Sequence, residues 1–212
     1  MSRRRNHPHF ARFYERLTPR CDDAWEGDLR AELCAPVTGR VLEIGAGNGP
    51  NFRHYREGVS VVAVEPEPTM IKLAEPRARE ADATIRLVRG DALALPFPDG
   101  SFDVVVCSLV LCTIPDPDRA LREIRRVVRP DGVVRLYEHV RSTDPTVAAI
   151  QDVVRWPWAL FAGGCHPNRD TAAAVERAGF ALHVRRFKPP FAGSWFVPHL
   201  IGEARPTAPA RP

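Results

Sequence analysis

Three glycines stand at alternate positions directly after a short apolar run, in the segment VLEIGAGNGP. They are Gly45, Gly47 and Gly49, and Pro50 follows them at a place that suits the first turn of a helix. Glycine permits a tight turn and lets a ligand approach the backbone closely. A simple strand-to-helix turn needs one glycine, so three in alternation predict a ligand-binding loop at the carboxyl end of a buried strand.

A carboxylate at the end of the next predicted strand indicates the kind of ligand. Glu65 follows Gly45 by 20 positions, which is the spacing at which an acidic residue grips the hydroxyl pair of a ribose. The two features together favour a ligand that contains adenosine. A dinucleotide loop would read G-x-G-x-x-G, and the glycine spacing here disfavours that type of site.

A second group of polar residues lies at the end of the fifth predicted strand. His139 is there a candidate base or acceptor-orienting residue, and a hydrogen-bonded loop histidine is the alternative. Glu138 either takes part in the chemistry or fixes His139 or a backbone turn. His166 is expected to be structural. Three aromatic residues either wall an apolar pocket or belong to the core: Trp156, Trp158 and Phe161.

The five cysteines show no C-x-x-C spacing and their number is odd. Neither a disulfide framework nor a metal site is therefore predicted. Cys107 and Cys112 lie in an apolar run and are expected to be small core residues.

Strand and helix patterns alternate from about residue 40 onward. Continuous β-branched runs predict buried parallel strands, and the helical patterns between them predict a doubly wound α/β sheet. The predicted strands cover residues 41–44, 61–64, 85–88, 103–110 and 133–138. Two closing strand patterns, FALHVRRF and WFVPHLIGEA, predict an antiparallel hairpin at one edge of the sheet.

These patterns divide the chain into three parts. Residues 1–35 form an N-terminal helical segment, residues 36–204 form the α/β domain, and residues 205–212 form a proline-rich tail that is expected to be disordered. Within the domain, residues 140–168 are expected to be a helical insertion on the acceptor side. Its helix is expected to be interrupted at Pro157.

Composition limits the classes of partner. The formal net charge is +4 over 212 residues, and the basic residues are dispersed along the chain, so no nucleic-acid partner is expected. No apolar run reaches the roughly 18 to 20 residues of a membrane span, and no apolar stretch follows the basic start. We therefore expect a cytoplasmic protein without integral membrane association, and the oligomeric state stays open.

The motifs around the glycines resemble those of class I S-adenosylmethionine-dependent methyltransferases. The order E-x-G-x-G-x-G begins at Glu43, and GDALALPFPDGSFDVVVCSLVL and ALREIRRVVRPDGVV are typical of that family. The resemblance implies a seven-stranded, mostly parallel Rossmann-like sheet with an antiparallel last strand, and S-adenosylmethionine as cofactor. It places these residues at the cofactor: Glu43, Gly45, Gly47, Gly49, Glu65, Asp91, Ala92 and Ser108.

The segments NFRHYREGVSVVAVEP, YEHV and RWPWALFAGGC are similar to the methyltransferase group that contains the animal thiol S-methyltransferases. That similarity implies a thiol or hydrosulfide as the methyl acceptor. Two departures are Glu65, where Asp is common, and the absence of an apolar N-terminal anchor. The alternatives are O-, C- or N-methylation of a quinone, lipid amine or natural product, and a non-catalytic module that binds S-adenosylmethionine.

Overall fold

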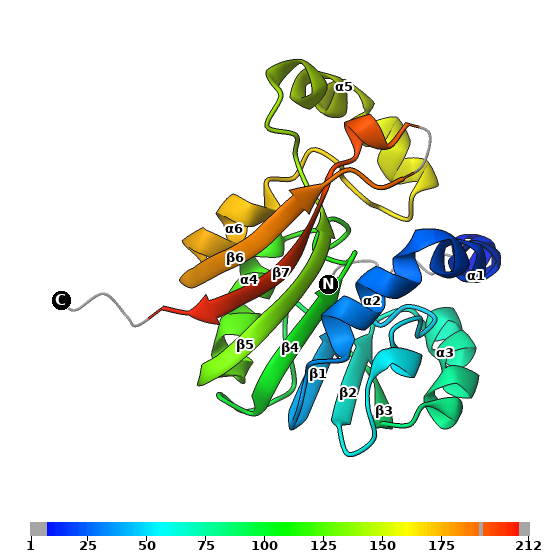
Figure 1. Ribbon diagram of the computed structural model, residues 1–212, viewed down its shortest axis with the longest axis vertical. Helices are drawn as coiled ribbons and strands as arrows, with labels where there is room; N and C mark the ends of the chain where they lie inside the picture. The colour runs from blue at the N-terminus through cyan, green and yellow to red at the C-terminus, as the bar shows by residue number, and fades with distance from the viewer. Residues whose placement is uncertain (1–7, 191–192, 208–212) are drawn as a thin grey trace.

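A seven-stranded sheet in the order β3-β2-β1-β4-β5-β7-β6 organises the molecule (Figure 1). It is seen in a computed structural model that describes residues 8–190 and 193–207. The strands are β1 (Arg40–Ile44), β2 (Ser60–Glu65), β3 (Thr84–Arg89), β4 (Phe102–Ser108), β5 (Val128–His139), β6 (Phe180–Phe187) and β7 (His199–Pro206).

The pairing of the strands confirms the predicted doubly wound sheet. Strands β1 to β5 are parallel to one another, whereas β7 runs antiparallel to both β5 and β6. The two closing strands thus form the predicted antiparallel pair, with β7 inserted next to β5. In this register His139 of β5 lies opposite His199 of β7.

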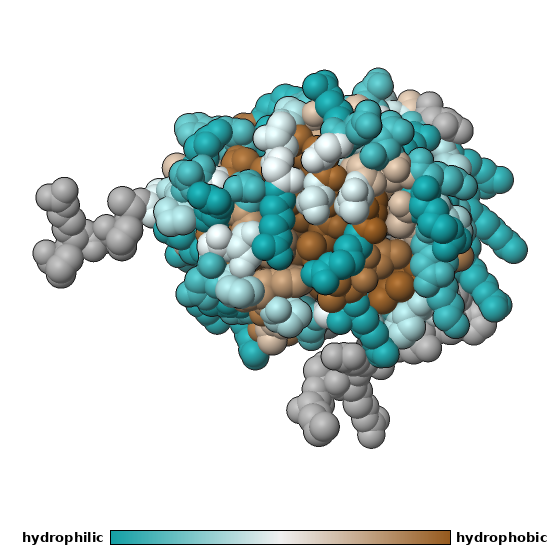
Figure 2. Space-filling view, turned by 90° about the horizontal axis from the view of Figure 1, so that it is seen from below, coloured by the Kyte–Doolittle hydropathy of each residue, from teal (hydrophilic) through white to brown (hydrophobic). Residues whose placement is uncertain are grey.

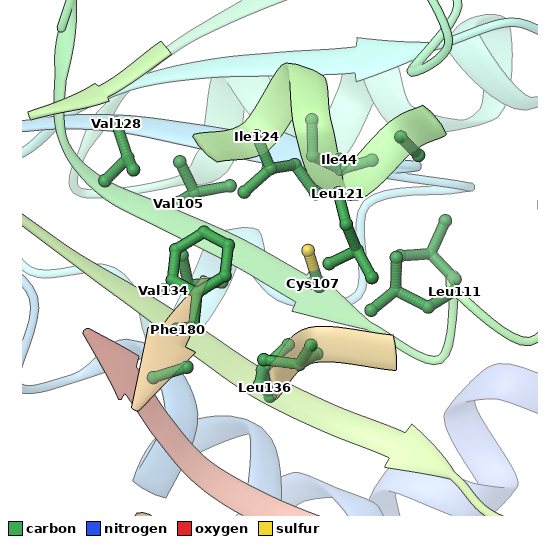
Figure 3. Packing of buried hydrophobic residues seen from close by; sticks show 14 of the residues in the cluster. Ile44, Val105, Cys107, Leu111, Leu121, Ile124, Val128, Val134, Leu136 and Phe180 are labelled. Carbon is green, nitrogen blue, oxygen red and sulfur yellow. The ribbon is translucent and has the colours of Figure 1, made fainter. Parts of the chain in front are cut away.

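Helices cover both faces of the sheet because each buries an apolar stripe against it. Helices α4 and α6 pack on one face, where Leu121, Ile124 and Phe180 meet the buried side chains of β1, β4 and β5 (Figure 3). Helices α2 and α3 pack on the other face. The helices are α1 (Pro8–Cys21), α2 (Gly27–Cys34), α3 (Pro68–Glu80), α4 (Pro117–Val127), α5 (Pro145–Phe161) and α6 (Thr171–Arg177).

Short helical turns and acidic caps complete these elements. The turns are η1 (Asp22–Glu26), η2 (Phe52–His54) and η3 (Ser194–Phe196). Helices α3, α4 and α5 each begin with a proline after an acidic N-cap whose carboxylate accepts backbone N–H groups. This combination satisfies donors that have no partner within the helix and explains where each helix starts.

The structure corrects several predicted boundaries. Helix α5 continues through Pro157, because the carbonyl left without a donor belongs to Val153, in an exposed turn that water can reach. Strand β4 ends at Ser108, since Leu109 has a positive φ of 53°. Strand β7 reaches Pro206, two residues into the predicted tail, and residues 208–212 lie outside the described residues.

The surface opposite to α5 has apolar residues at its centre and hydrophilic side chains around them (Figure 2). At the other end, α5 itself exposes large apolar side chains, among them Val153, Trp156 and Leu160. Within the described residues no helix combines the length and the apolar character that crossing a membrane requires.

Candidate functional site

The three glycines form a loop in which each has a positive φ, between 56° and 81°. A Cβ atom at Gly45 would lie 2.2 Å from Val110, and one at Gly49 would lie 2.6 Å from Phe52. A Cβ atom at Gly47 would meet only a Tyr14 ring carbon at 3.9 Å among the described residues. Packing therefore requires the outer two glycines, whereas a Cβ atom at the middle one would make only an ordinary van der Waals contact with Tyr14. The Gly47 side, called the open side of the loop below, is thus the less crowded one.

Glu65 and the glycine loop come together as the spacing indicates. Strand β2 lies beside β1, and the Glu65 carboxylate accepts hydrogen bonds from the backbone N–H groups of Gly47 and Glu67, both at 2.9 Å. The carboxylate is almost fully buried, and this burial raises the pKa of Glu65. Its bond to the middle glycine places an acidic acceptor at the open side of the loop.

Glu43 lies behind the loop, in the interior. Its carboxylate accepts hydrogen bonds from Asn51 Nδ2 and from the Tyr55 hydroxyl, each at 2.8 Å. Burial raises the pKa of Glu43 to about 7. Both oxygens are engaged with residues that follow the loop, so in this structure Glu43 supports the loop from within.

The other predicted cofactor residues lie at the carboxyl ends of β3 and β4, which flank the β2–β1 pair in the sheet. Asp91 Oδ1 accepts the backbone N–H of Leu93 at 2.9 Å, which closes a tight turn, and Ala92 packs against the core. The Ser108 hydroxyl accepts a hydrogen bond from Arg30 Nη1 at 3.2 Å. The structure therefore brings the predicted cofactor residues to one edge of the sheet.

Arg30 of α2 is a residue of this edge that sequence reasoning missed. Its side chain is only 1% exposed and its guanidinium contacts Asp22, Glu26, Asn51 and Ser108. An arginine so deeply buried has to be paired, because an unpaired buried charge is very costly. The sequence predicts a helix around Arg30 but does not show what this helix packs against, so it gives no sign that Arg30 is buried and paired.

Helix α1 closes over the glycine loop. Asn48 Nδ2 donates a hydrogen bond to Glu15 of α1, and Arg77 of α3 donates to the same carboxylate. Arg77 also donates to the carbonyl of Asn48 at 2.9 Å. The N-terminal segment is thus hydrogen-bonded to the loop and to α3, and it covers the predicted cofactor site.

Glu138 lies at the acceptor side, at the end of β5, and is fully buried. Its Oε1 accepts the backbone N–H groups of Val110 at 3.0 Å and Leu111 at 2.9 Å, just after the strained Leu109. Among the described residues its Oε2 has no hydrogen-bond partner. Burial raises the pKa of Glu138 to about 7, and the carboxylate fixes the turn that follows β4.

His139 lies between two sulfur atoms. Its Nδ1 is 3.2 Å from Cys165 Sγ and 3.9 Å from Cys112 Sγ. Burial lowers the pKa of His139, but the charge and hydrogen bond of Cys165, together with the charges of Glu138 and Glu26, outweigh this effect and the net shift is upward. The hydrogen bond from the Cys112 thiol, and then the charge and hydrogen bond of His139, lower the pKa of Cys165. Cys112 is therefore part of a polar cluster and does more than fill the core.

The aromatic residues of α5 fit neither alternative, a pocket wall or the core, in full. Trp156 and Phe161 are 66% and 77% exposed, so they belong neither to a pocket nor to the core. Trp158 is half-buried and packs edge-on against Phe196. The backbone N–H of His166 donates to the carbonyl of Cys112 at 2.9 Å, which supports the structural role expected of this segment.

Comparisons with known proteins fit this arrangement. Residues 42–136 match the family described as a methyltransferase domain. The chain is 34% identical to human thiol S-methyltransferase TMT1B over 203 residues, which cover 89% of this chain and 82% of that protein. It is 35% identical to the demethylmenaquinone methyltransferase of Deinococcus radiodurans over 195 residues, which cover 82% of this chain and 81% of that one.

Solved structures share the fold. A SAM-dependent methyltransferase from Aquifex aeolicus matches with a TM-score of 0.65 at 15% identity, covering 94% of this chain and 98% of that chain. The [4+2]-cyclase SpnF matches with a TM-score of 0.67 at 22% identity, covering 92% of this chain and 81% of that chain. At these identities the two matches establish the architecture alone.

Proposed function

Because the chain belongs to the class I S-adenosylmethionine-dependent methyltransferases, we propose that it methylates the sulfur of a small thiol. The cofactor of this family is S-adenosylmethionine, whose sulfonium is a good leaving group. The protein then has mainly to hold donor and acceptor in line. The acceptor has to lose its proton, because the thiolate is the nucleophile.

The observation that carries the proposal is the extent of the likeness to thiol S-methyltransferases. The match to the human enzyme covers 89% of this chain and so extends well beyond the methyltransferase domain at residues 42–136. Substrate elements lie largely outside the cofactor-binding half of such a sheet. A likeness that continues into them favours a shared class of acceptor.

We propose that S-adenosylmethionine, the methyl donor, binds at the open side of the glycine loop, next to Glu65 and Asp91. Glu65 accepts hydrogen bonds from the ribose hydroxyls and Asp91 accepts one from the adenine amino group, and Ala92 and Ser108 lie at the same ends of the strands. We assign His139 to the acceptor, because it stands where β5 ends and already contacts two sulfur atoms. Glu138 holds the 109–111 turn between the two halves.

A second candidate is C-methylation of a quinol. The likeness to the Deinococcus radiodurans demethylmenaquinone methyltransferase covers 82% of this chain and is the observation in its favour. A ring carbon acceptor would need no thiolate. Its reaction would therefore lack the rise in rate that a thiol shows as its proton is lost near a pKa of about 8.5.

The test is a methylation assay with S-adenosylmethionine that is labelled in the methyl group. We expect labelled thioether from an alkyl thiol or hydrosulfide, with a rate that rises with pH and then levels off. Phenols, amines and a reduced quinone in the same assay should give little product. Robust methylation of the quinol without any thioether would replace the thiol proposal by the second candidate.

The variant His139→Ala tests the acceptor side of the site without changing the donor side. It should lower thiol turnover by about 10²-fold, the low end for loss of a side chain that handles the reacting proton. The dissociation constant of S-adenosylhomocysteine, measured by calorimetry, should stay unchanged. His183→Ala on the edge strand β6 is the matched control. Unchanged turnover in His139→Ala would show that His139 has no role in the reaction.

A further inference from the structure

Three side chains with affinity for soft metals meet at the acceptor side of the sheet. Cys112 follows β4, His139 ends β5 and Cys165 follows α5. Their ligand atoms Sγ, Nδ1 and Sγ all lie within 4.8 Å of one another. Because 27 and 26 residues separate them along the chain, no spacing in the sequence reveals the group.

The distances from His139 Nδ1 to the two sulfur atoms are close to those between ligand atoms in a tetrahedral zinc site. Zn–S bonds of about 2.3 Å and Zn–N bonds of about 2.0 Å place a sulfur and a nitrogen ligand about 3.6 Å apart. The observed distances from His139 Nδ1 to the Cys165 and Cys112 sulfurs are 3.2 Å and 3.9 Å, on either side of that value. Movements of a few tenths of an ångström would bring each sulfur to this distance from Nδ1.

The backbone already holds these ligands in position. The His166 N–H donates to the Cys112 carbonyl at 2.9 Å, and the Cys165 N–H donates to the Ala162 carbonyl at 3.0 Å. Cys112 and Cys165 are 1% and 4% exposed, whereas His139 is only half-buried. Ligands fixed in this way bind a metal with little loss of conformational freedom.

Charge and chemistry distinguish a metal from the other ways to use two close cysteines. A disulfide would bring the sulfurs to about 2.05 Å and leave His139 without a partner. A shared cation instead uses all three groups, and two thiolates neutralise a divalent ion. The buried Glu138 beside His139 adds a negative charge, while the nearby Arg169 guanidinium donates to the carbonyls of Leu111 and Ile114.

We propose that Cys112, His139 and Cys165 bind Zn²⁺ and leave its fourth position to the sulfur of the acceptor. The second part rests on the proposed thiol methylation, and the metal site itself does not. Three protein ligands with one open position are the pattern of catalytic zinc sites. His139 then acts as a ligand to the metal, and the base is no longer required to be its imidazole.

The chemistry balances without an oxidant or reductant. The acceptor thiol binds Zn²⁺ and releases its proton to solvent, since a coordinated thiol is deprotonated. The zinc-bound thiolate then attacks the methyl carbon of S-adenosylmethionine. A new C–S bond forms to the acceptor, and the sulfonium C–S bond breaks with its electron pair left on S-adenosylhomocysteine. The neutral thioether is a poor ligand and leaves the metal.

Metal binding is tested without turnover, using the full chain reduced under anaerobic conditions. Co²⁺ should give the charge-transfer absorption of thiolate ligands and the intense visible bands of tetrahedral cobalt, and Zn²⁺ should abolish them by displacement. Cys112→Ser and Cys165→Ser should each weaken Zn²⁺ binding by more than about 100-fold. Cys21→Ser, whose cysteine lies away from the cluster in the first helical segment, is the control.

The wild-type spectrum keeps the test independent of whether the variants fold. Absence of the cobalt bands in reduced wild-type protein, or a Cys112–Cys165 disulfide found by mass spectrometry in place of bound metal, would overturn the site. The role in catalysis has its own readout. Removal of zinc by a chelator should lower thiol methylation at least about tenfold, and Zn²⁺ should restore it.

The experiments distinguish failure of the proposed zinc site from failure of the proposed thiol acceptor. Cobalt bands without methylation of any thiol would leave the metal site and overturn the thiol acceptor. Full thiol methylation by protein shown to be free of metal would leave the acceptor and overturn the role of zinc. Addition of a thiol should also shift the visible cobalt bands, which reports directly on the open position.

Discussion

One carboxylate performs two tasks at the donor edge of the sheet. Glu65 accepts the backbone N–H groups of Gly47 and Glu67, which fixes the glycine loop against β2. Its remaining acceptor capacity is available to the ribose of the donor, because an ionised carboxylate offers about four lone-pair sites. Loss of this side chain therefore removes both a ligand contact and a support of the loop.

We expect Glu65→Ala to raise the dissociation constant of S-adenosylhomocysteine by about 10- to 100-fold. The reason is that hydrogen bonds to a charged acceptor contribute about 1.5 to 3 kcal/mol. Calorimetry measures the change. Glu57→Ala, at an exposed position just before β2, is the matched control and should bind the ligand as the unchanged protein does. Equal affinity in both variants would place the ribose elsewhere.

At the scale of the element, the glycine loop combines two different demands. Gly45 and Gly49 avoid collisions with Val110 and Phe52. Gly47 has the same left-handed backbone, but a Cβ atom there would make only an ordinary contact with Tyr14, which suits a position kept free for a ligand. Gly58 also has a positive φ with nothing within 4 Å of its Cβ position, and it lies in the exposed turn before β2.

This pair of glycines provides a test with an internal control. Gly47→Ala and Gly58→Ala each force an alanine into the left-handed region, which costs roughly 1 to 2 kcal/mol of stability. We expect both variants to lose a similar amount in urea unfolding. Only Gly47→Ala should lose donor binding in calorimetry. Intact donor binding in Gly47→Ala would show that the open side of the loop is not the donor site.

Elements whose signals are local could be predicted from the sequence, and elements shaped by distant contacts could not. The β-branched runs locate β1 to β4, and acidic residues before prolines mark the starts of α4 and α5. The end of β4 depends on Leu109, which adopts a positive φ beside the bonds that Glu138 makes to Val110 and Leu111. Because a side chain of β5 stabilises this turn, the sequence of the turn itself does not predict where β4 ends.

At the scale of the whole molecule, Arg30 joins the N-terminal helices to the carboxyl ends of β1 and β4. Its guanidinium bridges Asp22 and Glu26 on one side to Asn51 and Ser108 on the other. Removal of one partner from a buried ion pair leaves an uncompensated charge, which is strongly destabilising. The predicted division at residue 35 therefore separates segments that are joined by a buried network.

We expect Arg30→Met to lower the free energy of unfolding by about 3 to 5 kcal/mol, because Asp22 and Glu26 lose their buried counter-charge. Arg53 also contacts Asp22, at 3.7 Å, but is 58% exposed. Arg53→Met should therefore change stability by less than about 1 kcal/mol. Urea denaturation followed by circular dichroism measures both variants, and equal losses would contradict the bridging role of Arg30.

The same scale explains which parts of the candidate site the sequence reveals. The glycines and Glu65 belong to adjacent strands in a recurrent motif, so their spacing alone predicts that they meet. Cys112, His139 and Cys165 come from three segments that only the complete fold brings together. Cys112 was therefore expected to be core packing, and its contact with His139 could be found only in three dimensions.

The position of β7 between β5 and β6 has a consequence for biosynthesis. Residues 199–206 leave the ribosome after every other strand of the sheet, yet they supply the neighbour that both β5 and β6 need. Until then β5 and β6 each lack the partner that β7 supplies, and unpaired strand edges invite association with other chains. His139 also lacks His199 opposite it in the ladder during that interval. A nascent chain is thus able to assemble the donor half first, whereas the acceptor half is completed only after residues 199–206 have left the ribosome.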